Sequence, residues 1–145
     1  MEDNNNRGIE ELFSLLGKQE SQFAAMYRNI AAGFGLSETE MWIYYMMLIH
    51  TDGVTQQIIS RQLSYKKQTV NSAVAKLVRK GTLMLTDNSE NNRSKIVRLT
   101  EKGQEFVEKT VKVLLTTEMK AAKKFGKRKL ESLCNLQEEY FRTLK

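Results

Sequence analysis

Cationic side chains gather, without any carboxylate, in the stretch from Gly53 to Leu85. A nucleic-acid duplex carries roughly one negative charge per 1.7 Å of its axis, so a carboxylate on an approaching surface is repelled. This composition favours binding of a polyanion, and the alternative is a solvated helix pair that lacks acids by chance. The stretch holds six lysines and arginines in a chain that is 28% charged: Arg61, Lys66, Lys67, Lys76, Arg79 and Lys80.

The same stretch predicts two short helices joined by a tight turn. Thr55 is a candidate N-cap for the first helix, whose apolar residues are Ile58, Ile59 and Leu63. Gly81 ends the second helix, whose apolar stripe has spacings of three and four: Val70, Ala73, Val74, Leu77 and Val78. Only Ser64–Lys67 separates the two stripes, which is typical of a helix-turn-helix.

The second helix carries hydrogen-bonding side chains on the face opposite its apolar stripe. A recognition helix buries one stripe and turns the other towards base edges, where amides, hydroxyls and ammonium groups can bind bases or phosphates. With the start of the first helix and a basic loop further along the chain, the candidate DNA-binding residues are Thr55, Gln56, Lys66, Lys67, Gln68, Thr69, Asn71, Ser72, Lys76, Arg93 and Lys95.

Charge is divided unevenly along the 145 residues. Residues 1–52 hold three Lys or Arg and eight Asp or Glu, a net charge of −5, whereas residues 53–145 hold twenty and nine, a net charge of +11. One face is therefore expected to meet a polyanion. The start of the chain lacks the pattern of a secretory signal, the longest apolar run (Met41–Ile49) is too short to cross a bilayer, and Cys134 is the single cysteine. A cytoplasmic, globular protein without membrane contact is expected.

Two helices are expected ahead of the helix-turn-helix. An apolar series with helical spacing runs over Ile9–Phe34 and predicts one long helix. A capping-box pattern of Ser37 with Glu40 then opens a second helix. This helix, Met41–His50, is apolar nearly all round, which is typical of a helix buried centrally.

Two strand candidates follow the basic stretch. Thr82–Thr86 and Ile96–Thr100 lie on either side of the polar run Asp87–Lys95, which predicts a hairpin. A hairpin directly behind a recognition helix is the wing of a winged helix. Arg93 at its tip suits a narrow minor groove, whose negative potential favours a guanidinium group.

Long amphipathic helices are expected at both ends of the chain. After the wing, one helix runs from Thr100 and a last one follows a break at Gly126. The expected fold is mainly α with a small β-hairpin wing: a winged helix-turn-helix lobe (37–100) between N-terminal (1–36) and C-terminal (101–145) dimerisation helices. One such lobe cannot cover all these stripes, so an intertwined homodimer is expected. The candidate dimerisation residues are Leu12, Phe13, Leu16, Leu130, Leu133, Tyr140, Phe141 and Leu144.

The order of these elements, together with two motifs, resembles the MarR family of bacterial transcriptional regulators. One motif, Thr69–Gly81, is similar to the family's recognition helix with its basic-Gly end. The other combines Asp87, Arg93-Ser94-Lys95 and Leu99-Thr100-Glu101-Lys102-Gly103, and is similar to the family's wing and exit. The resemblance covers residues 9–145. It implies a dimer that binds a palindromic operator, and members often release DNA when a small ligand or an oxidant arrives.

Two positions depart from the family pattern. Lys66 stands at the N-cap of the recognition helix, where the family usually has Ser, Thr or Asp, unless Ser64 caps the helix earlier. Ser89 stands where the wing often has arginine, and the loop is one residue longer, so Arg93 is the clear wing arginine.

Several side chains are candidates for sensing a small molecule or a metal. The resemblance places a ligand cleft where the central helix meets the first and fifth helices, and thioethers and aromatic rings suit a flat apolar ligand. The candidate pocket residues are Met26, Trp42, Tyr45 and Met46, with ordinary core as the alternative. His50 and Cys134 alone supply too few ligands for zinc, so no metal is expected. Cys134 is expected to be a small buried hydrophobe and His50 to lie at a helix end.

No enzyme motif is present in the sequence. It contains no Gly-rich phosphate loop, no nucleophile motif beside a histidine and no HExxH pair, so neither catalysis nor a cofactor is expected. The sequence predicts a sequence-specific DNA-binding transcriptional regulator: a homodimeric repressor on a palindromic operator, released by a small apolar or aromatic effector. A winged-helix protein-interaction adaptor and a nonspecific architectural DNA-binding protein remain as alternatives.

Overall fold

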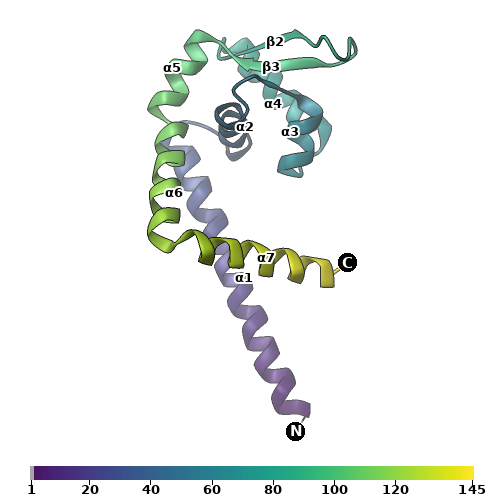
Figure 1. Ribbon diagram of the computed structural model, residues 1–145, viewed down its shortest axis with the longest axis vertical. Coiled ribbons are helices and arrows are strands. Elements are labelled where there is room, and N and C mark those ends of the chain that lie inside the picture. The colour runs from purple at the N-terminus through teal and green to yellow at the C-terminus, as the bar shows by residue number, and fades with distance from the viewer. Residues whose placement is uncertain (1) are drawn as a thin grey trace.

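The computed structural model describes the backbone of residues 2–145 and the side chains of residues 6–145. Its elements are α1 (Glu2–Gly33), α2 (Glu38–Ile49), β1 (Val54–Thr55), α3 (Gln56–Leu63), α4 (Lys67–Arg79), β2 (Leu83–Asp87), β3 (Lys95–Leu99), α5 (Glu101–Lys109), α6 (Val111–Phe125) and α7 (Lys127–Thr143). Figure 1 shows α2, α3, α4 and the strands gathered in one lobe, with α1, α6 and α7 extending away from it. The predicted fold, mainly α with a small hairpin, is confirmed.

α1 is a single helix of 32 residues. It begins ahead of the expected start at Ile9 and runs without a break to Gly33, after which Gly35, with φ of 72°, turns the chain. Tyr27 and Ala31 near its end are buried, whereas the side chains of residues 6–23 are exposed. Only the C-terminal third of α1 therefore packs against the rest of the chain.

α2 lies at the centre of the lobe, as its composition predicts. Ser37 and Glu40 form the expected capping box: the Glu40 N–H donates to the Ser37 hydroxyl at 3.2 Å, and the Ser37 N–H donates to the Glu40 carboxylate at 2.9 Å. His50 is the C-cap residue, at the helix end where it was expected. Apolar side chains on several sides of α2 are buried: Met41, Ile43, Tyr44, Met46 and Met47.

One carboxylate lies inside this apolar interface. Glu40 is only 3% exposed, and one of its oxygens lies 2.6 Å from the ammonium of Lys76 on α4. Burial on its own would raise the pKa of Glu40, but the Lys76 ammonium and the Ser37 N–H outweigh it and hold that pKa below its usual value. The ion pair therefore joins the central helix to α4.

The helix-turn-helix forms where the sequence predicts it. The Thr55 hydroxyl caps α3 by accepting from the Ile58 N–H at 3.3 Å. Ser64 ends α3 in the left-handed conformation (φ 54°), so the alternative in which Ser64 caps α4 is wrong. Lys66 is the N-cap residue of α4 and makes no side-chain capping bond. α4 closes at Arg79, followed by Gly81 with φ of 79°.

The sheet contains one strand more than the sequence predicts. β2 and β3 form the expected antiparallel hairpin, with Leu85 opposite Val97, and the two-residue β1 pairs with the other edge of β3. Gly53 leads into β1 with φ of 83°, and a Cβ there would lie 2.5 Å from Cγ2 of Ile96. Close approach to β3 therefore requires glycine at this turn.

The exit from the wing packs tightly against the end of the recognition motif. The Thr100 hydroxyl caps α5 by accepting from the Gly103 N–H at 3.0 Å, and it donates to the Gly81 carbonyl at 2.5 Å. A Cβ on Gly103 would lie 2.0 Å from the carbonyl oxygen of Thr82. The Leu-Thr-x-x-Gly motif thus supplies both a cap and a close helix contact.

The C-terminal part of the chain has one break that was predicted and one that was not. Gly126, with φ of 103°, separates α6 from α7 as expected. Thr110 (φ −126°, ψ −90°) also separates α5 from α6, where one continuous helix was expected. No residue of α7 is buried within the chain. Cys134 is therefore exposed, and the expectation that it is buried is wrong for the single chain. None of the helices in the described part of the chain combines the length and apolar character needed to span a bilayer.

We expect Lys76→Met to lower the free energy of unfolding at neutral pH by about 1–3 kcal/mol, because Glu40 keeps its burial and loses its cationic partner. Lys67→Met, at an exposed lysine of α4, should change this free energy by less than about 0.5 kcal/mol. Urea unfolding of both variants measures the difference.

The pH dependence provides a second check on the same pair. Because the folded-state pKa of Glu40 is lowered, its stabilising contribution is complete above the ordinary value of 4.5 and is lost as the pH falls through the folded-state pKa. The difference in the free energy of unfolding between wild type and Lys76→Met should therefore narrow as the pH falls below 4.5. If wild type and Lys76→Met differed by the same free energy of unfolding in acid and at neutral pH, the ion pair would be contradicted.

Candidate nucleic-acid interface

α4 presents a polar face above a fully buried stripe. Val70, Val74 and Leu77 have no exposed surface, and they hold the helix against the lobe. The polar residues predicted for DNA contact at its start are all exposed: Lys66, Lys67, Gln68, Thr69, Asn71 and Ser72. No Asp or Glu occurs in α3 or α4, so no carboxylate of the motif opposes an approaching phosphate.

The polar residues of α4 divide into an outer face and a flank. At about 100° per residue, Gln68 and Ser72 point directly away from the buried stripe, whereas Lys67 and Asn71 turn towards α3. An open groove of about 440 Å³ lies on that flank and is lined by Gln56, Gln57, Lys67, Gln68 and Asn71. The structure thus brings the predicted residues from both helices together, and adds Gln57, which the sequence interpretation missed.

Lys76 differs from the other predicted contacts. Its ammonium is paired with Glu40, so it lies on the flank of α4 that faces α2. A charge neutralised in this way is a weaker partner for a phosphate than the unpaired ammonium groups of Lys66 and Lys67. The Thr55 hydroxyl is also less free to contact DNA, because it already accepts the capping hydrogen bond of α3.

The start of α4 leaves backbone donors open. The first N–H groups of a helix have no partner within the helix, and a capping side chain normally satisfies one of them. Lys66 makes no such bond, so the first turn keeps its N–H groups beside two ammonium groups. The helix dipole adds partial positive charge at this end, which makes it suited to a phosphate.

The wing loop is held by its own polar side chains. Asn88 donates to the Ser94 hydroxyl at 3.0 Å, and the Asn91 side chain accepts from the Arg93 N–H at 3.0 Å. Lys95 pairs with Asp87 at the base of the loop and lowers the pKa of that exposed carboxyl group. The Arg93 side chain is exposed and has no ion pair among the described side chains, so it is a free cation at the wing loop.

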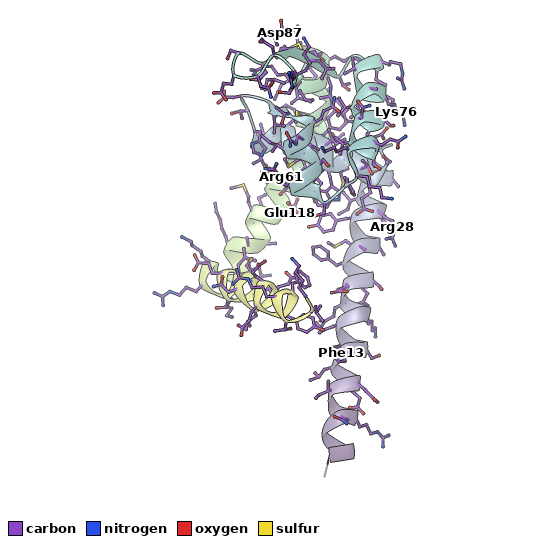
Figure 2. All side chains as sticks on the ribbon, turned by 90° about the vertical axis from the view of Figure 1, so that its right-hand side faces the viewer. Phe13, Arg28, Arg61, Lys76, Asp87 and Glu118 are labelled. Atoms are coloured by element: carbon purple, nitrogen blue, oxygen red, sulfur yellow. The ribbon has the colours of Figure 1, made fainter. Side chains whose placement is uncertain are left out.

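The residues predicted for dimerisation lie on surfaces that the chain leaves uncovered. Large apolar side chains are exposed along both α1 and α7, for example Leu12 at 61% and Leu133 at 53%. Figure 1 shows the N-terminal half of α1 extending beyond the other elements, and Figure 2 shows Phe13 on that half. The other predicted residues are exposed as well, apart from the half-buried Tyr140: Leu16, Leu130, Phe141 and Leu144.

The residues predicted to line an effector pocket are not equivalent in the structure. Trp42 and Tyr45 pack together, with ring centroids 5.3 Å apart. Met46 is buried in the core, whereas Met26 is half exposed on α1. Tyr27, whose ring lies 4.9 Å from that of Trp42, was missed by the sequence interpretation although it neighbours Met26. No cluster of three or more metal-ligating side chains occurs among the residues described by the structure.

Solved structures show which known proteins share this fold. The transcription regulator MarR from Oenococcus oeni PSU-1 is 17% identical, the match covers 90% of this chain and 98% of that one, and the TM-score is 0.74. S. aureus MepR in its DNA-binding conformation is 19% identical over 92% and 98% of the two chains, also with a TM-score of 0.74. The S. aureus MepR–DNA complex is 18% identical over 92% and 96%, with a TM-score of 0.65.

These likenesses extend over nearly the whole chain, but at low sequence identity. No family model and no curated protein sequence matches the chain. At such identities, structural similarity establishes the fold, and function has to be argued from the site. The chain therefore shares the fold of MarR-family transcription regulators, as its motifs predicted.

Proposed function

We propose that this chain is a MarR-family transcriptional regulator that binds a palindromic DNA operator as a homodimer. The observation that carries the proposal is the face of α4: an exposed, acid-free surface of amides, hydroxyls and ammonium groups on a fully buried stripe. A helix of this construction, next to a wing with a free arginine, fits the major and minor grooves of a duplex. The MepR–DNA complex, a protein of the same fold, supports the same interpretation.

The homodimer is supported by the uncovered helices. α1 and α7 expose apolar side chains along their length, and these surfaces are too large to remain in water on a stable protein. A second copy supplies the same surfaces with two-fold symmetry, which explains why a palindrome would be read. Repression is the simplest outcome, because a dimer bound over a promoter blocks polymerase by occupancy alone.

An effector and a cellular location complete the proposal. A small apolar or aromatic molecule would bind where α1, α2 and α6 meet, beside Trp42 and Tyr45. Because the DNA that it regulates lies in the cytoplasm of a bacterium, the protein would work there.

Selection of bound duplexes from a random pool tests the proposal directly. Enrichment of a palindrome with half-sites about one helical turn apart is the expected result. Binding without an enriched sequence would indicate an architectural protein, and no binding would indicate a protein-interaction adaptor. Either result would overturn the proposed function.

Base reading is assigned to the start of α4. We expect Gln68→Ala or Asn71→Ala to relax the preference at one base pair in each half-site by about 1–3 kcal/mol, because amides pair with adenine through two hydrogen bonds. Nonspecific affinity should hardly change. Binding of each variant to single-base operator mutants measures this, with Gln104→Ala on α5 as the control. A uniform loss across the set would mean that these amides hold phosphates.

The salt dependence of DNA affinity tests whether Lys67 of α4 contacts a phosphate. For Lys67→Ala, the slope of log K against log salt should become shallower by about 1 per subunit, since one phosphate contact is lost. Lys112→Ala, on α6 and paired with Glu108 of α5, should leave the slope unchanged. Titrations with operator DNA at several salt concentrations measure the slopes, and an effect of equal size for both variants would contradict the interface.

The terminal helices should carry the dimer contact. We expect Leu133→Glu or Phe141→Glu to produce a monomer, because a carboxylate in a packed apolar interface costs several kcal/mol. Ile49→Glu places the same charge on an exposed apolar residue at the end of α2 and should leave the dimer intact. Sedimentation velocity distinguishes the two, and a dimeric Leu133→Glu variant would locate the interface elsewhere.

A further inference from the structure

One carboxylate joins three helices that are distant in sequence. The two oxygens of Glu118, on α6, each accept a hydrogen bond from a phenol at 2.5 Å: Oε1 from Tyr27 on α1 and Oε2 from Tyr45 on α2. Figure 2 shows Glu118 directly below the lobe, close to α1. These three side chains are called the Glu118 junction.

Aromatic packing holds the two phenols of the junction in place. The ring of Trp42 packs against both, with its centroid 4.9 Å from that of Tyr27 and 5.3 Å from that of Tyr45. The ring of Phe23 also packs against Tyr27, with centroids 4.8 Å apart. Burial, together with the neighbouring carboxylate, raises the pKa of both Tyr27 and Tyr45, so both remain protonated donors at neutral pH.

Among the described side chains, no cation pairs with the junction: none of their ion pairs includes Glu118. The carboxylate therefore depends on the two hydroxyl groups for its hydrogen bonds inside the protein. Hydrogen bonds to an ionised group are about twice as strong as neutral ones, and they are directional. The junction thus constrains both the distance and the angle between its helices.

The backbone connections beside the junction contain residues that can act as hinges for that angle. Between the lobe and α6, the chain passes Thr110, where the helix is interrupted without a side-chain capping bond. Between α1 and α2, it passes the turn at Gly35. A few residues at helix ends can absorb large changes in dihedral angle, as hinges do. The side-chain contacts of α2, which include Tyr45, must then hold the lobe in position.

The constraint continues from the junction to the recognition helix. Tyr45 lies on α2, and the same helix carries Glu40, whose carboxylate pairs with Lys76 on α4 at 2.6 Å. Val70, Val74 and Leu77 also fix α4 against the lobe's core. A rotation of α2 relative to α6 would therefore move α4 with it.

We propose that Glu118 is a positioning residue: by binding Tyr27 and Tyr45 together it fixes the angle between the DNA-binding lobe and α6, and so sets the half-site spacing that the dimer accepts. The spacing part of this inference rests on the proposed function. In a two-fold dimer built on the terminal helices, any change of this angle occurs twice, so the two recognition helices would move apart or together.

The first test compares operators that differ in spacing. Tyr27→Phe/Tyr45→Phe removes both hydroxyl groups of the junction and keeps the packed rings. Wild type should prefer the duplex with the best half-site spacing over duplexes whose spacing is longer or shorter by about one or two base pairs. We expect this preference, measured as a ratio of affinities, to be roughly three- to tenfold smaller in the double variant. Affinity for an isolated half-site should stay the same. A variant with the wild-type spacing profile would overturn the proposal.

Tyr44→Phe is the matched control for the spacing test. It removes a tyrosine hydroxyl group from the same helix as Tyr45, but this hydroxyl is hydrogen-bonded to Thr82 (2.6 Å), and both residues lie inside the lobe. It should lower the melting temperature and leave the spacing profile unchanged. If Tyr44→Phe changed the profile as much as the junction variant does, loss of stability would explain both, and the positioning role would be overturned.

The second test needs neither DNA nor a dimer. Two spin labels, at Arg61→Cys on α3 and Ala121→Cys on α6, report the distance between the lobe and α6. The labelled protein also carries Cys134→Ser, and it is diluted with unlabelled protein so that only distances within one chain are measured. We expect a narrow distribution that broadens or shifts with Tyr27→Phe/Tyr45→Phe. An unchanged distribution overturns the positioning role of Glu118. A wild-type protein without any spacing preference would instead contradict the proposed function.

Discussion

A helix without a polar face must be covered on every side, and α2 is such a helix. Its burial between α1, α4 and α6 requires these elements to surround it, although they are far apart in the sequence. Glu40, a charged group buried inside this cover, remains tolerable because it has both a cap donor and Lys76 as partners. The orientation of α4, and with it the candidate DNA-binding face, follows from the packing of α2.

Local patterns were sufficient to predict much of the fold and the candidate site. The capping box of Ser37 and Glu40, the cap at Thr55 and the helix end at Gly81 each depend on residues within one turn of each other. The hairpin follows from two β-rich runs around a polar loop. The exposed start of α4 follows from its apolar spacing, because the buried stripe determines which side chains face outward.

The features that the sequence did not reveal depend on contacts between distant residues. β1 has only two residues and exists because β3 offers a free edge beside Gly53. Lys76 looks like a surface lysine until α2 places Glu40 beside it. Glu118 and Tyr27 lie 91 positions apart, so no spacing rule links them. The break at Thr110 has no Gly or Pro to signal it, and the exposure of Cys134 depends on what α7 packs against.

The length of α1 would make the folding of its N-terminal half depend on formation of the proposed homodimer. At about 1.5 Å per residue, its 32 residues span about 48 Å, and most of that length has no cover within the chain. A helix of ordinary composition gains most of its stability in water from tertiary packing. In the proposed homodimer, the second copy would supply that packing for the N-terminal half of α1, so the order of this half would follow mass action. Newly made chains at low copy number would then expose Leu12 and Phe13 to proteases and chaperones, and each encounter with a second copy would protect them.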